Sequence, residues 1–256
     1  MKYNYFIKKG YKTLNEIKKF DIKYWEDNYK NTNKPLYFQY YVYKFARKIL
    51  KKNNLESVLD IGCRDARKLM KLLFPICNEI YGIDHELYFI NYCKKKYKLA
   101  NFFVDDIENS NLNLNKTFDL IISADVIEHL LDPDSLILYI KRFSHKNSYI
   151  ILSTPERDRL RGPKCGTSIS EGHIREWNFK EFKDYLNYNG FEVISHKIVF
   201  NTKFFHIIWN FFFEGKKKLK VYFNNFIILL KIILLKKSKE RRRTQSTQLV
   251  LCKLRN

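Results

Sequence analysis

The 256 residues are enough for one domain with a substantial hydrophobic core, and a hydrophobic content of 45% argues against a disordered chain. The formal net charge of +21 favours anionic partners such as nucleic acid, acidic lipid or phosphorylated substrates, but the joint abundance of Lys, Asn, Ile, Tyr and Phe is typical of AT-rich coding and weakens that signal. Five scattered cysteines without a CxxC pair argue against a disulfide framework and a cysteine zinc site, and they predict a cytoplasmic location.

Residues 1–35 show little periodicity and are predicted to form an N-terminal extension. Its first ten residues lack an apolar core of signal-peptide length, so we do not expect secretion. From residue 36 to residue 200 short apolar runs alternate with helical patterns, and the first is a helix whose apolar residues from Tyr41 to Leu50 share one face. Strands are predicted at residues 58–61, 80–83, 102–104, 118–122, 149–152, 191–200 and 248–254.

Strands that alternate with crossover helices predict the fold class. Such a chain forms a doubly wound, mostly parallel α/β sheet that is covered on both faces, as in Rossmann-like domains. The core of this fold is predicted to span residues 36–200. Its last helix begins at Asn178, a favourable N-cap with Glu181 three residues later, and Gly190 is a natural stop.

Residues 201–247 are predicted to form a helical, basic and apolar insertion before a final core strand at 248–256. The segment holds two apolar runs, and 13 Lys or Arg residues stand against two Glu between residues 214 and 256. Neither run approaches the roughly 20 residues that cross a bilayer. Two hypotheses remain open: the insertion only caps the domain, or residues 201–243 also contact the inner face of a membrane.

The end of the first predicted strand has the features of a ligand site. In an open parallel sheet, ligands bind beyond the carboxyl ends of the strands. Gly62 follows the strand that contains Asp60 and allows a tight turn with close backbone approach. Asp84 ends the second strand about 20 residues later, where its carboxylate is placed to accept hydrogen bonds from ribose hydroxyls.

These motifs resemble those of class I S-adenosylmethionine-dependent methyltransferases over roughly residues 37–200. Residues 58–66 resemble the family's first motif, Asp84 its ribose-binding acid, residues 104–107 its third strand end and residues 118–130 its fourth motif. The resemblance implies that Asp106 faces the adenine amino group and that Ile107 packs on the ring. The implied set of S-adenosylmethionine-binding residues is Asp60, Gly62, Asp84, Asp106, Ile107 and Ala124.

The chain departs from the family at two positions of the first motif. Arg64 and Ala66 stand where the family commonly has glycine, and Arg64 either reaches the methionine carboxylate or points to solvent. A dinucleotide-binding oxidoreductase is disfavoured, because its pyrophosphate turn requires the full G-x-G-x-x-G pattern. A non-catalytic S-adenosylmethionine-binding protein remains an alternative.

Acidic residues and histidines after the fourth strand are the candidate catalytic group. Asp125, Glu128 and His129 are predicted to share one face of a helix. The ubiquinone-pathway O-methyltransferases and the small-RNA 2′-O-methyltransferases have a similar motif, and the latter add a downstream histidine that matches His173 here. This resemblance implies that Asp125, Glu128, His129 and His173 bind Mg²⁺ or Mn²⁺. The alternatives are that His129 acts as a general base without a metal, or that the group is structural.

The loops at residues 153–161 and 172–177 resemble those of bacterial methyltransferases of surface-sugar and lipid-carried glycan pathways. The resemblance favours an O-methyltransferase for a sugar, a lipid-linked or another small hydroxylated substrate. Arg175 and Trp177 are the candidate substrate-binding residues, and Arg157, Arg159 and Arg161 are candidate contacts to a phosphate. The alternative is an RNA 2′-O-methyltransferase, which the net charge favours and the lack of a recognised RNA-binding module disfavours.

Overall fold

The computed structural model describes residues 5–14, 21–30, 32, 36–77, 79–170, 172–200 and 246–255. Its centre is a seven-stranded sheet with the order β3-β2-β1-β4-β5-β7-β6. The strands are β1 (Ser57–Ile61), β2 (Glu79–Asp84), β3 (Asn101–Val104), β4 (Phe118–Ala124), β5 (Ser144–Pro155), β6 (Phe191–Val199) and β7 (Thr247–Leu254).

The sheet is mostly parallel. β3, β2, β1, β4 and β5 pair in parallel, whereas β7 is antiparallel to both β5 and β6. The predicted doubly wound α/β fold is therefore confirmed, and each predicted strand coincides with an observed one. The carboxyl ends of the parallel strands meet along one edge, which is where a ligand site of this fold is expected.

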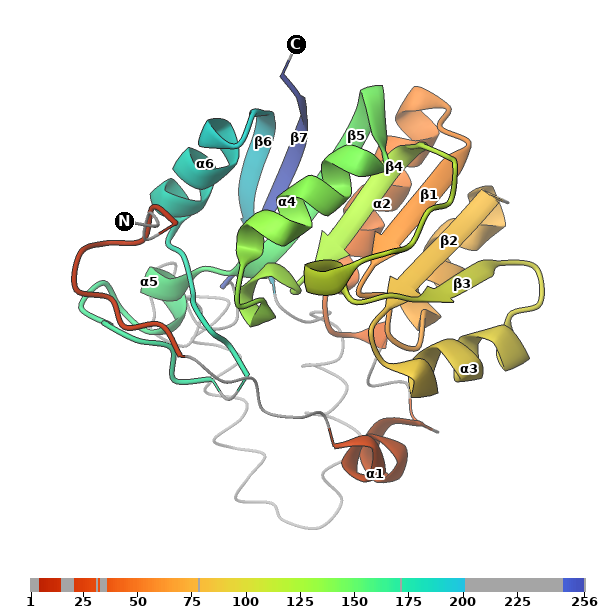
Figure 1. Ribbon diagram of the computed structural model, residues 1–256, viewed down its shortest axis with the longest axis horizontal. Helices are drawn as coiled ribbons and strands as arrows, with labels where there is room; N and C mark the ends of the chain where they lie inside the picture. The colour runs from red at the N-terminus through yellow and green to blue at the C-terminus, as the bar shows by residue number, and fades with distance from the viewer. Residues whose placement is uncertain are drawn as a thin grey trace, which may run out of the picture.

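Helices cover both faces of the sheet, as Figure 1 shows for α4 in front of the strands and α2 behind them. One hydrophobic core lies under α4 (Pro133–Arg142) and α6 (Phe179–Tyr188), and a second lies under α2 (Tyr40–Asn53) and α3 (Leu87–Lys96). The other helical elements are α1 (Ile22–Trp25), α5 (Arg157–Leu160), the π-helical segments η1 (Glu26–Lys30) and η3 (Leu69–Leu73), and the 3-10 turns η4 (Phe74–Ile76), η5 (Ile107–Asn109) and η6 (Ile127–His129).

The predicted limits of α6 are confirmed by its capping interactions. Asn178 accepts a hydrogen bond from the Glu181 backbone N–H at 2.9 Å, and Glu181 accepts one from the Asn178 N–H at 2.9 Å. This reciprocal pair satisfies donors that a helix start otherwise leaves exposed. Gly190 follows the helix with a φ of +82°, the left-handed conformation that ends helices.

The first part of the N-terminal extension packs on the core beside the loop before α6 (Figure 1). Lys12 pairs with Thr167 in an isolated bridge. The Leu14 N–H donates to the Ile174 carbonyl at 3.0 Å. This segment thus holds a loop of the candidate site from outside, a role that its weak periodicity gave no means of predicting.

Residues 201–245 lie outside the described residues, and with them most of the predicted helical insertion and membrane-contact segment. The final strand begins at Thr247. Among the described residues, no helix combines the length and the hydropathy needed to cross a membrane.

Candidate active site

The loop after β1 requires glycine at its first position. Gly62 has a φ of +77°, and a Cβ atom there would lie 2.5 Å from Cγ2 of Val126. Its N–H donates to the Ile83 carbonyl at 2.8 Å, which ties the end of β1 to β2. The backbone of the loop therefore runs close against the segment after β4, where no side chain fits.

Asp60 is a buried acid just before this turn. The Tyr43 hydroxyl donates to both carboxylate oxygens, at 3.1 and 2.9 Å. Burial raises the pKa of Asp60 to about 7, and the hydrogen bond from Tyr43 partly opposes that rise. Helix α2 thus orients this carboxyl from the opposite side of the turn.

Asp84 stands at the carboxyl end of β2, where the sequence predicted a ribose-binding acid. One of its oxygens accepts the Arg64 N–H at 2.8 Å and the other accepts the Glu86 N–H at 3.0 Å. A carboxylate has about four acceptor positions, so each oxygen retains one for a ligand hydroxyl. Backbone from two loops therefore fixes this side chain before any ligand binds.

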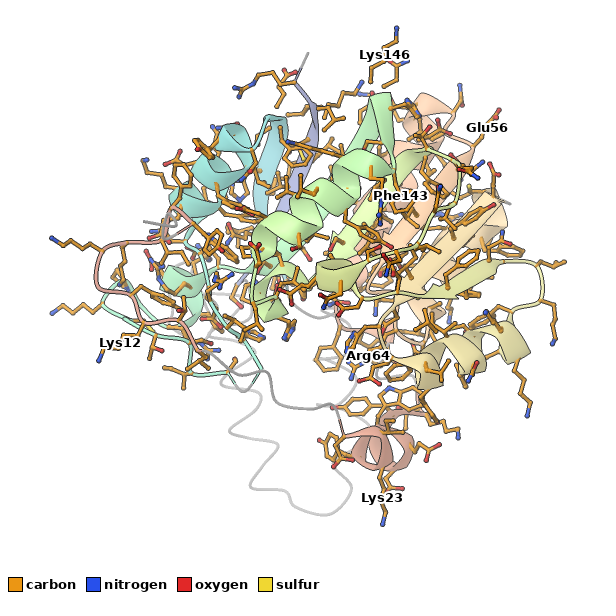
Figure 2. The ribbon with its side chains drawn as sticks, in the orientation of Figure 1. Lys12, Lys23, Glu56, Arg64, Phe143 and Lys146 are labelled. Carbon is orange, nitrogen blue, oxygen red and sulfur yellow. The ribbon has the colours of Figure 1, made fainter. Side chains whose placement is uncertain are left out.

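Arg64 and Ala66 adopt the conformation that glycine favours, with φ angles of +52° and +51°. The loop therefore keeps the backbone geometry for which the family commonly uses glycine. Figure 2 shows Arg64 beyond the strand ends, between the sheet and α1, whereas Glu56 and Lys146 lie at the opposite edge.

Asp106, Ile107 and Ala124 line the same edge. Asp106 is exposed and caps η5 by accepting the Glu108 N–H at 3.0 Å, and Ile107 is half-buried. The carbonyl of Ala124 accepts a hydrogen bond from Gln39 at 3.0 Å. Sequence reasoning missed Gln39, because nothing local marks a residue that approaches β4 only through the fold.

Glu128, His129 and His173 come together, with one potential ligand atom from each lying within 4.8 Å of the others. Nδ1 of His129 lies 2.7 Å from the Gly172 carbonyl, and Nδ1 of His173 lies 2.8 Å from a carboxylate oxygen of Glu176. Because both partners only accept hydrogen bonds, each Nδ1 carries the proton. Nε2 of each imidazole is then the nitrogen left to accept a proton or to bind a metal.

The carboxyl of Glu128 is fully buried beside these histidines. One oxygen accepts the Thr154 hydroxyl at 2.9 Å, and the other has no hydrogen-bond partner in the described part of the chain. Burial, together with the nearby Asp125 charge, raises the pKa of Glu128 well above its ordinary value. A cation at this point would supply the missing partner and favour the ionised form.

The surroundings of His129 keep its imidazole neutral. Burial, with repulsion from His173, lowers the pKa of His129 to about 4. Burial by itself would raise the pKa of Glu176, but hydrogen bonds from His173 and Arg161 outweigh it and lower that pKa. A carbonyl and an ionised carboxylate behind two imidazoles are the usual support of metal-binding histidines, so this donor set fits a divalent cation.

The expectation that Asp125 shares a helix face with Glu128 and His129 is wrong. Asp125 has a φ of +55°, and only the short 3-10 turn η6 follows it. Its carboxylate accepts hydrogen bonds from Ser153 at 2.7 Å and from Gln39 at 3.1 Å. Asp125 therefore lies outside the group of three and supports the end of β4.

The structure also corrects the predicted substrate contacts of Arg175 and Trp177, which lie inside the protein. Arg175 is 4% exposed and donates to the carbonyls of Leu130 and Leu131 at 3.2 and 2.7 Å. Trp177 is fully buried, and its indole N–H donates to the Tyr5 carbonyl at 2.8 Å. Both residues hold the site loop in place, and neither reaches a substrate in this conformation.

Two of the arginines expected to contact a phosphate are also engaged within the chain. Arg157 is fully buried and forms two hydrogen bonds with Glu181, at 2.7 and 3.0 Å. Arg161 lies 3.2 Å from Glu176. Acids within the chain thus pair with Arg157 and Arg161, which were expected to contact the acceptor. The role of the Arg159 side chain stays a prediction.

A sheet of this order, with a glycine turn after its first strand and an acid at the end of its second, matches the fold that the resemblance to class I S-adenosylmethionine-dependent methyltransferases implied. The sequence profile of the methyltransferase-domain family matches residues 37–196. The chain therefore belongs to this family.

Relatives and solved structures agree with this class. The chain is 29% identical over 171 residues to the small RNA 2′-O-methyltransferase of Mus musculus, a match that covers 58% of this chain and 41% of that protein. A crystal structure of an S-adenosylmethionine-dependent methyltransferase from Clostridium acetobutylicum has a TM-score of 0.56 at 14% identity, with 91% of this chain and 97% of that chain covered. The plantazolicin methyltransferase BamL, solved in complex with SAH, has a TM-score of 0.58 at 17% identity, and the match covers 91% of this chain and 89% of that chain. The chain spans 41–58% of the length of the curated relatives it matches.

Proposed function

We propose that the chain transfers the methyl group of S-adenosylmethionine to a hydroxyl of a sugar, carried by a small or lipid-linked acceptor. The observation that supports this proposal is the group of Glu128, His129 and His173 beside the edge where the cofactor motifs end. A hydroxyl is a weak nucleophile, so its methylation needs a base or a Lewis acid next to the acceptor oxygen. The neutral imidazole of His129, the imidazole of His173 and the buried carboxyl of Glu128 supply either one.

The three side chains have defined parts in this proposal. Nε2 of His129, Nε2 of His173 and the carboxylate of Glu128 would hold Mg²⁺ or Mn²⁺, which when bound polarises the acceptor hydroxyl. Glu176 acts through His173 by fixing its tautomer, and Gly172 does the same for His129. Without a metal, His129 is the candidate base, because its lowered pKa leaves it unprotonated at neutral pH.

A second candidate acceptor is the 2′-hydroxyl of RNA. It is favoured by the likeness to small RNA 2′-O-methyltransferases and by the net charge of +21. The resemblance of the loops at residues 153–161 and 172–177 to those of glycan-pathway methyltransferases favours the sugar acceptor instead. Both candidates use the same hydroxyl chemistry, so the histidine group serves either one.

Methyl transfer from isotope-labelled S-adenosylmethionine tests the role of the histidine group. We expect His129→Ala and His173→Ala to lower turnover at least a hundredfold while binding of SAH is retained. His145→Ala is the matched control, because this half-buried histidine pairs with Asp119 outside the group. Loss of turnover in EDTA, with recovery on addition of Mg²⁺ or Mn²⁺, supports a bound metal. Full activity in EDTA supports His129 as a general base without a metal. Full activity of both variants refutes a catalytic role for the histidine group.

The acceptor is identified by running the same assay on two substrate sets. One holds undecaprenyl-diphosphate-linked and free glycans, and the other holds short RNAs with either a 2′-hydroxyl or a 2′-deoxy sugar at the 3′ end. Labelling of the glycans supports the first candidate. Labelling that disappears with the 2′-deoxy end supports the second and contradicts the first.

We also propose a peripheral membrane contact through residues 201–243, on sequence grounds alone. Each cation near an anionic surface contributes about 1 kcal/mol. Sedimentation with vesicles of phosphatidylserine and phosphatidylcholine at low salt tests this contact. A protein that stays in the supernatant refutes it.

A further inference from the structure

A cleft of about 810 Å³ lies between Lys30, Thr32 and Leu36 on one side and the segment 67–74 and the carboxyl end of α3 on the other. It shares no lining residue with the active site, because none of the residues of the cofactor motifs or of the histidine group lines it. Its lining residues are Lys30, Thr32, Leu36, Arg67, Met70, Lys71, Phe74, Lys96, Tyr97, Lys98 and Leu99.

The cleft is strongly basic. Five of its eleven lining residues are Lys or Arg and none is Asp or Glu, whereas the whole chain has 48 basic and 27 acidic residues in 256. The fraction of basic residues in the lining is therefore more than twice that of the chain. The general abundance of lysine does not account for this concentration, and a positive potential at the cleft attracts anions.

Two of the five cations are engaged by acids, and no acid among the described residues pairs with the other three. Lys30 pairs with Glu26 at 2.6 Å and Arg67 with Asp65 at 2.9 Å. Lys96 donates to the hydroxyl of Tyr92 at 2.7 Å, and this partner carries no charge. Within the described ranges, no acid pairs with the exposed side chains of Lys71 and Lys98.

Arg67 fixes one wall of the cleft. Its side chain is 9% exposed, and its guanidinium donates to the carbonyls of Tyr29, Lys30 and Thr32. A buried arginine that donates to three carbonyls of one short segment keeps Tyr29, Lys30 and Thr32 against the segment after β1. The wall is therefore set by the fold, and a ligand does not have to order it.

Apart from Thr32, the rest of the lining is apolar or aromatic. Phe74 and Tyr97 are half-buried, and Leu99 is 77% exposed at the rim. Lysine ammonium groups next to ring faces are the combination that binds phosphates and stacks planar bases. The size of the cleft suits a ligand of about one or two nucleotides.

We propose that this cleft is a second binding site, for a phosphorylated ligand of nucleotide type, with phosphate groups on Lys71, Lys96 and Lys98 and a planar ring on Tyr97 or Phe74. The proposal does not depend on the identity of the methyl acceptor. The ligand is either a free nucleotide or one unit of an RNA strand, since both present the same phosphate and base.

Binding is measured on the full chain with saturating SAH, so that the adenosine-binding edge is blocked. The probes are UDP, inorganic pyrophosphate and a fluorescent decauridylate, at 0.15 M salt. We expect Lys71→Ala/Lys98→Ala to raise the Kd for UDP and decauridylate at least tenfold. The matched control is Lys94→Ala/Lys95→Ala, which removes the same charge from exposed positions of α3 outside the cleft, and we expect it to change the Kd less than threefold.

The outcomes separate a site from general electrostatics. Decauridylate that binds at least tenfold more tightly than UDP supports the RNA strand, and similar affinities support the free nucleotide. Equal weakening by both double variants, or no binding of any probe, overturns the proposal. SAH affinity is expected to stay the same in both variants, which shows that they fold and that the two sites are separate.

Discussion

At the scale of single residues, a buried acid without a charged partner in contact makes the free energy of unfolding depend on pH. Asp60 is such a residue, with a pKa of about 7 in the folded chain. An acid whose pKa is higher in the folded state holds its proton more tightly there, so stability falls as the pH rises from about 4 to about 7.

We therefore expect Asp60→Asn to reduce the loss of stability between pH 5 and pH 8 by about 1–3 kcal/mol relative to the wild type. The measurement is urea unfolding at the two pH values without cofactor. Tyr43→Phe is the companion variant: it removes the hydroxyl donor and raises the folded-state pKa of Asp60 further, so the decline in stability extends to higher pH. An unchanged pH dependence in Asp60→Asn would contradict the account of this residue.

Gly62 gives a second prediction at this scale. In Gly62→Ala the new methyl group meets Val126 at 2.5 Å, and the backbone has a φ of +77° that alanine disfavours. We expect the variant to lose about 1–3 kcal/mol of stability and to bind SAH more weakly. Gly166→Ala is the control, because a Cβ atom there meets nothing within 4 Å. Equal stabilities of the two variants would show that the turn does not require glycine.

At the scale of elements, strands and α6 could be predicted because local patterns determine them. Apolar runs of four to eight residues become buried strands in a parallel sheet, and the Asn178–Glu181 capping box marks a helix start by itself. The turn after β4 could not be predicted in this way. The left-handed φ of Asp125 is stabilised by Ser153 and Gln39, which are 28 and 86 residues away in the chain.

The same limit applies to the arginines after β5. Their charge indicated a phosphate contact. Arg157 pairs with the adjacent Asp158, but Glu176 and Glu181, which engage Arg161 and Arg157, follow 15 and 24 residues later and become partners only through the fold. Sequence alone did not distinguish an arginine that binds a ligand from one that forms a buried ion pair.

The buried pair between α5 and α6 is tested by removing one charge or both. Arg157→Ala leaves the Glu181 carboxylate without its partner, and we expect a loss of about 3–5 kcal/mol in the free energy of unfolding. The double variant Arg157→Met/Glu181→Met removes both charges and is expected to recover part of that loss. A fully stable Arg157→Ala that turns over its acceptor with a raised KM would instead restore the substrate-contact prediction.

At the scale of the whole molecule, the N-terminal segment connects distant parts of the active site. Tyr11 is 7% exposed, and its hydroxyl accepts the Glu176 N–H at 3.1 Å. Glu176 in turn orients His173. A segment without periodicity thus supports the histidine group from more than 160 residues away, which no local pattern predicts.

We expect Tyr11→Ala to lower the free energy of unfolding by about 3 kcal/mol and to speed hydrogen exchange in residues 172–177. Lys9→Ala, at an exposed position of the same segment, is the control and is expected to change neither quantity. Unchanged exchange in the loop of the Tyr11 variant would mean that the segment does not support the site.

The central claim is that the carboxyl edge of the sheet binds the methyl donor through Asp84, and calorimetric titration with SAH tests it most directly. Hydrogen bonds to an ionised acceptor contribute about 1.5–3 kcal/mol each, so Asp84→Ala is expected to weaken binding at least tenfold. Glu192→Ala, which removes an exposed acid from β6, is expected to bind as the wild type does. A folded wild type that does not bind SAH, or an Asp84→Ala variant that binds it equally well, would contradict the account.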